Sequence, residues 1–365
     1  MNENTYEILK ELKKKIKGVN ISIMSESVAR KTSYIKTPSL DLNRVLSGDL
    51  YKGIPERTMV GITGPEHSFK SSFACLCAAN AVQQGYTPII IDTENAMTTE
   101  FCERWGLDTT NAIYISTIWI EEVMSVLVNI KESGLEKMII ILDSVGGLDR
   151  KKMWNDAMNN DPKIDQGQLQ RTIRSLMKIL TNICMESNSI VVFTAHLFAR
   201  PGMGSIPMPD DVSGGKAVKL FPSILINLKK QSLKKDEKSE MSIINALVVK
   251  NRFYPPFQEA TIDISYQNGI NPVAGLSELL LPDKANILKK EGNSYYYVDS
   301  GEKYATYDRN LEEKLKTDTE ILDQLNEWLK TTGYSTVNEN VKEAEELELE
   351  LDEIEETKPT KKKKK

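Results

Sequence analysis

The run from Gly64 to Ser71 carries the chemistry needed to hold a nucleoside triphosphate. It reads GPEHSFKS and fits the phosphate-binding pattern G-x-x-x-x-G-K-[ST], except that Phe69 stands where the second glycine is usual. In such a loop, backbone N–H groups wrap the phosphates and the following helix presents its positive end. Lys70 can reach the β- and γ-phosphates, and the Ser71 hydroxyl can bind Mg²⁺. We therefore expect this loop to bind ATP and Mg²⁺ through Gly64, Pro65, Glu66, His67, Ser68, Phe69, Lys70, Ser71 and Ser72.

The phenylalanine at position 69 departs from the usual pattern. Its side chain must point away from the phosphates, and a residue with a Cβ at this point strains the backbone. Phe69 removes no phosphate ligand, so we expect it to alter nucleotide affinity without abolishing the site.

Two acidic residues follow apolar runs downstream of the loop. Asp143 ends the run MIIILD, and Glu94 follows the run PIIID. A carboxylate at the end of a strand beside the phosphate loop suits Mg²⁺ binding, and one near the γ-phosphate can orient and deprotonate the attacking water. The alternatives are a turn that starts at Asp143 and a helix capped by Glu94. With the loop upstream, we expect Asp143 and Ser71 to serve the metal, and Glu94 to be catalytic.

His67 and His196 are the two histidines of the chain. His67 lies within the phosphate loop, and His196 ends the run SIVVFTAH, where a strand meets a long loop. A purely structural histidine is one interpretation of His196. The other is a γ-phosphate sensor that acts through a hydrogen bond rather than through charge.

The surrounding pattern predicts a doubly wound α/β core. Strand-like runs rich in Ile and Val alternate with amphipathic helices from Met59 to about Ile264, which is typical of a mainly parallel sheet buried on both faces. We expect an N-terminal helix and linker over 1–36, the core over 37–275 and a small α+β subdomain over 276–333. That subdomain should contain a hairpin around Ser300–Gly301. The segment 334–365 is acidic with a basic end and is expected to be disordered.

The composition and net charge of the chain limit the classes of protein to which it can belong. Of the 365 residues, 40% are hydrophobic, no apolar run reaches the length of a membrane span, and the start of the chain has no signal-peptide core. We therefore expect a cytoplasmic protein with no membrane partner. The four cysteines have no metal-ligand spacing, and the net charge of −5 means that any DNA site must be local.

The first helix needs a partner. Tyr6, Ile8, Leu9, Leu12 and Ile16 recur at near-helical spacing and form an apolar face. Such a face must pack on the core or on a neighbouring subunit.

Five motifs in one order resemble the RecA family of DNA strand-exchange proteins over residues 37 to about 270. They are the phosphate loop, DTENA from Asp92, LDSV from Leu142, FTAH from Phe193 and SGGK from Ser213. Phe69, and His196 in place of glutamine, are most similar to the phage UvsX-type branch. The resemblance implies a RecA-like ATPase core whose N-terminal helix is a polymerisation arm. It also implies that Glu94 is the catalytic glutamate, that Phe101 stacks on adenine and that His196 couples the γ-phosphate to DNA.

The same resemblance assigns Lys250 and Arg252 to the phosphates of the neighbouring subunit. A cation supplied in trans would stabilise transition-state charge and make hydrolysis depend on assembly. Without the family resemblance, the sequence would favour the alternative that these two residues lie on a solvated strand edge.

DNA binding is expected at two loops, from about Arg150 to Gln166 and from about Leu197 to Ser213. Gly214 and Gly215 open a helix whose N–H groups can bind a DNA phosphate, and three basic residues share one face of the helix after the first loop. Solvated charge and simple linkers are the alternatives. No code for reading base edges is visible, so binding should be largely independent of sequence. The expected DNA-binding residues are Lys151, Lys152, Arg171, Arg174, Lys178, Arg200, Ser213, Gly214, Gly215 and Lys216.

These observations favour an ATP-dependent recombinase that forms filaments on single-stranded DNA and exchanges strands with a homologous duplex. The expected partners are single- and double-stranded DNA, further copies of the chain, and single-strand-binding and mediator proteins. If the protein is phage-encoded, its compartment is the host bacterial cytoplasm. The alternatives are a RecA-like mediator without strand exchange, a ring helicase with the same core, and a small-molecule kinase.

Overall fold

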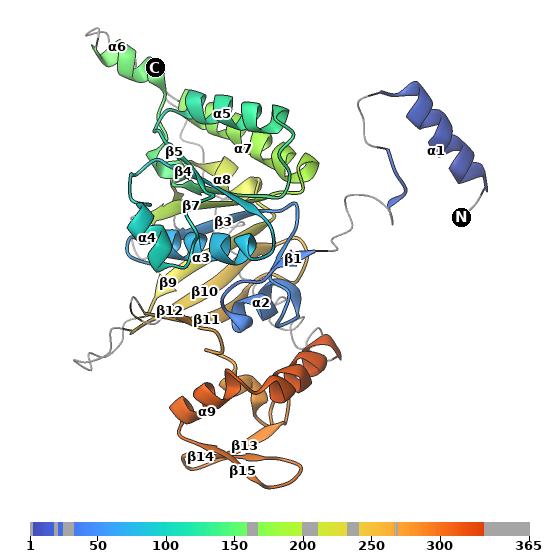
Figure 1. Cartoon of the computed structure of the whole chain (residues 1–365), viewed down its shortest axis with the longest axis vertical. Helices are drawn as coiled ribbons and strands as arrows, with labels where there is room; N and C mark the ends of the chain where they lie inside the picture. The colour runs from blue at the N-terminus through green and yellow to red at the C-terminus, as the bar shows by residue number, and fades with distance from the viewer. Residues whose placement is uncertain are drawn as a thin grey trace, which may run out of the picture.

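The computed structural model describes residues 3–17, 21–24, 33–158, 167–198, 211–231, 241–265, 267 and 269–331. A large sheet dominates it, with neighbouring strands in the order β12-β11-β10-β9-β3-β7-β6-β4-β5 (Figure 1). The parallel strands are β3 (Met59–Gly64), β4 (Thr87–Asp92), β5 (Ile113–Ser116), β6 (Met138–Asp143), β7 (Ile190–Phe198) and β9 (Ile224–Lys230). The antiparallel extension is β10 (Met241–Asn251), β11 (Gln258–Ser265) and β12 (Gly269–Asn271). The predicted mainly parallel α/β core is confirmed.

Helices cover both faces of this sheet, which explains why its central strands are continuous apolar runs. One face packs against α2 (Leu40–Ser47), α3 (Lys70–Val82) and α4 (Thr99–Arg104). The other packs against α5 (Ile120–Glu132), α7 (Gln168–Glu186) and α8 (Lys216–Leu220). Among the described residues, no helix combines the length and apolar character needed to cross a bilayer.

The register of the parallel strands gathers the polar residues at one edge. Gly64 lies opposite His196 across β3 and β7, and Asp92 lies opposite Asp143 across β4 and β6. Because all four strands run in the same direction, their carboxyl ends form a single edge, where ligands bind in doubly wound folds.

Smaller elements complete the core. A two-stranded sheet pairs β1 (Tyr34–Ile35) with β2 (Ile54–Pro55), and β8 (Asp211–Val212) pairs antiparallel with the end of β7. A short 3-10 helix, η2 (Val145–Gly147), follows β6, and a second one, η3 (Ser277–Leu280), follows β12.

The C-terminal part has its own apolar cluster and a three-stranded sheet. β13 (Leu288–Glu291), β14 (Ser294–Tyr297) and β15 (Lys303–Thr306) pair in sequence, followed by α9 (Asp308–Leu315) and a helix over 319–331. The hairpin predicted around Ser300–Gly301 joins β14 to β15, whereas β13 was not foreseen. Asn326 and Asp323 bond to Leu50 N and Tyr51 Oη at 2.8 and 2.7 Å, which ties this part to the core. The exact domain boundaries stay predictions.

The first predicted DNA loop contains a helix instead. α6 (Lys151–Met158) forms directly after Arg150, because Lys, Met and Ala are good helix formers and no glycine or proline interrupts the run. Residues 159–166 and 199–210, Arg200 among them, lie outside the described residues, as does the predicted acidic tail.

The N-terminal helix α1 (Glu3–Lys15) stands apart from the core in Figure 1. Tyr6, Ile8, Leu12 and Ile16 on or just after it are all exposed, Tyr6 and Ile8 by more than half. The amphipathic helix was predicted, and none of the described residues of this chain covers its apolar face.

Candidate functional site: a nucleotide cleft linked to a loop at the sheet edge

A cleft of about 430 Å³ opens at the carboxyl edge of the sheet. The structure brings together in it nearly all of the residues predicted for the nucleotide. Its lining consists of Glu66, His67, Ser68, Phe69, Lys70, Ser71, Ser72, Glu94, Ala96, Phe101, Asp143 and His196. Gly64 and Pro65 lead into this lining from the end of β3.

The phosphate loop is closely packed by its own residues. Ser68 Oγ and Lys70 Nζ both donate to the carbonyl oxygen of Pro65, at 2.8 and 2.6 Å. A Cβ at Gly64 would lie 2.4 Å from the carbonyl oxygen of Leu228, so only glycine fits there. Burial lowers the pKa of Lys70, and the carboxylates of Asp143, Glu94 and Glu66 oppose that shift.

Phe69 adopts a left-handed conformation, with φ 63° and ψ 24°. For a residue with a Cβ this costs about 1–2 kcal/mol. Its ring meets the ring of Trp105 edge-on, with centroids 6.4 Å apart, and packs against the core. An aromatic pair contributes about 0.5–1.5 kcal/mol beyond burial, so the contact offsets much of the strain. The side chain packs on the core and also lines the nucleotide cleft, so its predicted direction away from bound phosphates stays a prediction.

Asp143 is the strongest candidate for a metal-binding residue. Its side chain is buried, and Thr194 donates a hydrogen bond to Oδ1. Among the described residues, no donor forms a hydrogen bond with the buried Oδ2. Burial raises the pKa of Asp143, and the hydroxyls of Thr194 and Ser71 offset part of the rise. An orphaned carboxylate oxygen beside a serine hydroxyl matches the oxygen ligands that Mg²⁺ prefers. Thr194 was missed, although a threonine within the apolar run IVVF-T-A was a visible signal.

Glu94 is positioned by residues around it. Asp92, which is fully buried, accepts hydrogen bonds from the backbone N–H groups of Glu94 and Met97 at 3.0 and 2.9 Å and so shapes the turn after β4. Ser144 Oγ donates to Glu94 Oε1, and His196 Nε2 lies 3.4 Å from the same oxygen. Asp92 and Ser144 were not predicted to have these positioning contacts, because nothing local in the sequence announces them.

His196 also connects the cleft to the start of α8. Its backbone N–H donates to Ser213 Oγ, and the Ser213 N–H donates back to the His196 carbonyl, both at 2.9 Å. Gly214 and Gly215 follow with positive φ, and a Cβ on Gly215 would lie 2.1 Å from Gln170 Oε1 at the start of α7. The predicted residues Ser213 to Lys216 therefore lie beside the first turn of α7.

The basic residues predicted for DNA that the structure describes, which leaves out Arg200, are exposed but differ in their surroundings. Arg171, Arg174 and Lys178 share one exposed face of α7. On α6, Lys152 is exposed, whereas Lys151 Nζ lies 2.5 Å from Glu122 Oε1. Exposed Met153 and Trp154 accompany these lysines.

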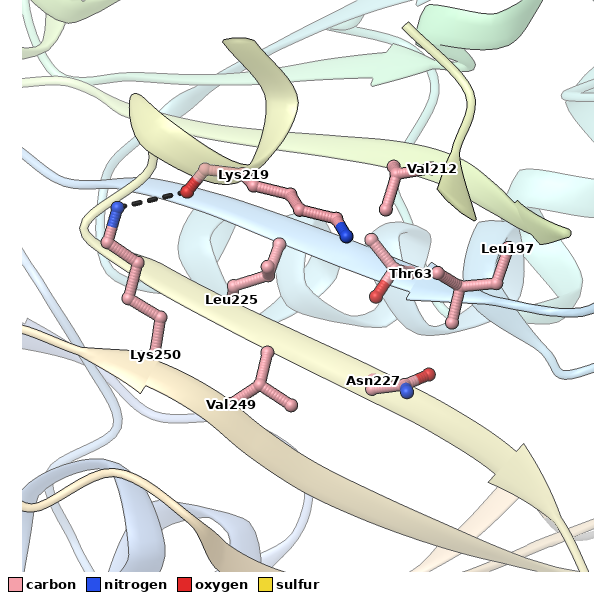
Figure 2. Close-up of a pocket in the computed structure, with 8 residues that line it drawn as sticks. All are labelled: Thr63, Leu197, Val212, Lys219, Leu225, Asn227, Val249 and Lys250. Atoms are coloured by element: carbon pink, nitrogen blue, oxygen red, sulfur yellow. Dashed lines mark hydrogen bonds between the residues drawn. The ribbon is translucent and has the colours of Figure 1, made fainter. Parts of the chain in front are cut away.

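Lys250 and Arg252 do not line the nucleotide cleft of their own chain. A register shift between Val248 and Lys250 in the pairing of β10 with β9 redirects Lys250 toward α8. Its Nζ donates to the carbonyl oxygen of Lys219 at 3.0 Å, as Figure 2 shows, and also to the carbonyl oxygen of Leu220 at 2.7 Å. Arg252 also donates to the Leu220 carbonyl, at 3.4 Å. The two cations thus complement the negative end of α8.

A second cavity, of about 510 Å³, lies beside this contact. Thr63, Leu197, Val212, Lys219, Leu225, Asn227, Val249 and Lys250 line it, as Figure 2 shows. Burial lowers the pKa of Lys250, and the nearby charge of Arg252 lowers it further. An anion bound beside Lys250 would oppose both effects.

Comparison with known proteins decides the family. The RecA N-terminal domain family matches residues 4–271, which is most of the chain. The chain belongs to the RecA family. It is therefore a DNA-dependent ATPase that acts in DNA recombination and repair.

Bacterial relatives named Protein RecA align over most of their length. The one from Wolinella succinogenes is 28% identical over 303 residues, which cover 83% of each chain. The one from Clostridioides difficile is 27% identical over 346 residues, which cover 92% of this chain and 97% of the relative. The family expectation is confirmed, and the closer resemblance to the phage branch of the RecA family stays a prediction.

Proposed function

We propose that this chain forms filaments on single-stranded DNA, pairs them with a homologous duplex and exchanges strands, with ATP bound between adjacent copies. One copy would contribute Lys70, Ser71, Glu94 and Asp143, and its neighbour would contribute Lys250 and Arg252. The observation that carries the proposal is the position of His196. Its Nε2 lies 3.4 Å from Glu94 Oε1, and its backbone N–H donates to Ser213 Oγ just before α8. A small-molecule kinase would have no use for this link, whereas a DNA-dependent ATPase needs one.

Binding would rest on the phosphate loop. Lys70 would exchange the Pro65 carbonyl for the β- and γ-phosphates, and the loop N–H groups would hold the rest of the triphosphate. Phe101 would stack on the base. Asp143 and Ser71 would hold Mg²⁺, which would supply positive charge to offset the negative charge of the phosphates.

Hydrolysis would use Glu94 as the general base. Ser144 and His196 both approach Oε1, which leaves Oε2 to orient the attacking water and accept its proton. Lys250 and Arg252 from the next copy would stabilise the charge that develops on the γ-phosphate, so that turnover requires assembly.

DNA would bind beside the joined starts of α7 and α8. Arg171, Arg174 and Lys178, with Lys151 and Lys152 on α6, would contact backbone phosphates. Ser213, Gly214, Gly215 and Lys216 would present N–H groups at the start of α8. Arg200 belongs to the same proposal from the sequence alone. α1 would join copies by packing its apolar face on the next core.

The proposed activity also implies protein partners and a cellular compartment. Single-strand-binding and mediator proteins would be its partners, and the cytoplasm, that of a bacterial host if the gene is a phage gene, would be its compartment. The domain limits 1–36, 37–275, 276–333 and 334–365 belong to the same proposal.

Electron microscopy of the full chain with ATP, Mg²⁺ and single-stranded DNA tests the assembly, and a joint-molecule assay tests the exchange. Helical filaments that form joint molecules are expected. Closed rings would instead indicate a helicase, and filaments without joint molecules would indicate a mediator. An ATPase indifferent to single-stranded DNA would contradict the proposal.

A further inference from the structure

Three aromatic rings link the phosphate loop to α4. Phe69 belongs to the phosphate loop and Phe101 lies on α4, and both side chains line the cleft. Trp105 lies between them, with ring centroids 6.4 Å from Phe69 and 6.5 Å from Phe101, and both contacts are edge-on. Trp105 is only 3% exposed, so the chain of rings is anchored in the core.

The backbone at position 69 does not call for phenylalanine. Its left-handed conformation is one that glycine adopts without strain. The reason for a phenylalanine must therefore lie in what its ring touches. On one side that is Trp105, and on the other the ammonium group of Lys230 lies 5.9 Å from the ring centroid.

The helix that carries Phe101 depends on such packing. α4 has six residues. The Thr98 side chain caps its start by accepting a hydrogen bond from the Phe101 N–H, and Trp105 is the C-cap residue directly after its last residue, Arg104. A helix this short is not stable by itself, so tertiary contacts decide where it lies. The Phe69 ring supplies one of these contacts directly from the phosphate loop.

We propose that Phe69 is a positioning residue for the nucleoside: through Trp105 it fixes α4, and thereby sets the Phe101 ring at the distance from the phosphate loop that a nucleoside triphosphate spans. This inference rests on the ATP site proposed above. If it is correct, binding of the phosphates and binding of the base depend on different residues. The phosphates are held by Lys70 and the loop N–H groups, which need no ring at position 69, whereas contact with the base needs the three rings in place.

The test compares ATP with inorganic tripolyphosphate, which has the phosphates and no nucleoside. Dissociation constants of both are measured by calorimetry, with Mg²⁺, on the full chain and on Phe69→Gly. Because stacking of a base on an aromatic ring is a sizeable part of such binding, we expect Phe69→Gly to weaken ATP about ten-fold and tripolyphosphate less than about two-fold. Phe69→Tyr, which keeps the ring, should retain the wild-type ratio of the two constants.

A matched control variant tests whether the effect is specific to position 69, and a double-mutant cycle tests whether Phe69 acts through Phe101. Phe257 is also a phenylalanine with positive φ, at 62°, and lies outside the cleft lining, so Phe257→Gly should leave the ratio unchanged. If Phe69 acts through Phe101, then Phe69→Gly should cause little further loss of ATP affinity in a Phe101→Ala background.

The outcomes separate this inference from the proposed function. Equal weakening of ATP and tripolyphosphate by Phe69→Gly, an unchanged ratio, or fully additive losses with Phe101→Ala would overturn the inference while leaving the ATP site in place. A wild-type chain that binds neither compound would overturn the ATP site and the inference with it.

Discussion

His196 Nε2 lies 3.4 Å from Glu94 Oε1, although the two residues are 102 positions apart in the chain. The contact joins the carboxylate proposed to activate water to a histidine whose backbone is bonded to Ser213. In the proposed function, a movement of His196 in response to the γ-phosphate would be passed through Ser213 to the start of α8. If His196 couples the two sites as proposed, DNA bound near α8 would in turn act on Glu94, since coupling between two sites acts in both directions.

Glu94→Gln should reduce ATP hydrolysis by roughly 100-fold or more while ATP-dependent assembly on DNA is retained, because the amide keeps the shape but cannot accept a proton. Phosphate release and filament length are the measurements. Glu132→Gln, at an exposed position on α5, is the control and should leave hydrolysis unchanged. Retained turnover in Glu94→Gln would remove Glu94 from its role.

His196→Ala should uncouple the two sites. We expect stimulation of the ATPase by single-stranded DNA to fall about ten-fold, in keeping with a coupling of a few kcal/mol at most, while ATP affinity changes little. His196→Gln keeps a hydrogen-bond donor without a titratable charge and should preserve most of the stimulation. A Gln variant as defective as the Ala variant would show that more than a hydrogen bond is involved.

Lys70→Ala and Lys250→Ala should each abolish the ATPase when alone and should partly complement each other when mixed. In a randomly mixed filament about one in four interfaces would carry both intact halves, because the contact is head-to-tail. The measurement is the ATPase rate on DNA as a function of the mixing ratio. If the two variants stay inactive at every ratio, Lys250 does not act across the interface.

Asp143→Asn should stabilise the nucleotide-free protein, and the gain should depend on pH. Burial raises the pKa of Asp143 above that of the unfolded chain. The unfavourable effect of ionising it is therefore absent at pH below the ordinary carboxyl range and fully present above the raised pKa. We expect thermal unfolding to show a larger gain at mildly alkaline than at acidic pH. The stabilisation of the wild type by Mg²⁺ with ATP should be lost in the variant, and a gain independent of pH would contradict this account.

Leu12→Asp should block assembly without unfolding the core. Leu12 lies on the exposed apolar face of α1, and a buried unpaired carboxylate would weaken that contact by several kcal/mol if the face packs on a neighbouring copy. Sedimentation with ATP and DNA would then show short oligomers or monomers. Lys13→Asp makes a larger charge change on the same helix and should assemble more readily. Normal filaments from Leu12→Asp would show that α1 is not the joint.

The sequence by itself determined the core and most of the cleft. The phosphate loop is a continuous run whose chemistry depends on its own backbone, and the alternation of apolar runs with amphipathic helices follows from the period of each element. Asp143 and Glu94 could be placed because both follow strands, and the carboxyl ends of parallel strands meet at one edge.

Only the tertiary structure decided the contacts between elements. Strand order and register bring Ser144 and Thr194 to the carboxylates, set Trp105 between Phe69 and Phe101, and turn Lys250 toward α8. A pattern read along one element reports which face is buried, but not which element covers that face. The residues that contact these side chains lie far away in the sequence. Which residues meet is therefore decided by how the elements pack in the folded chain.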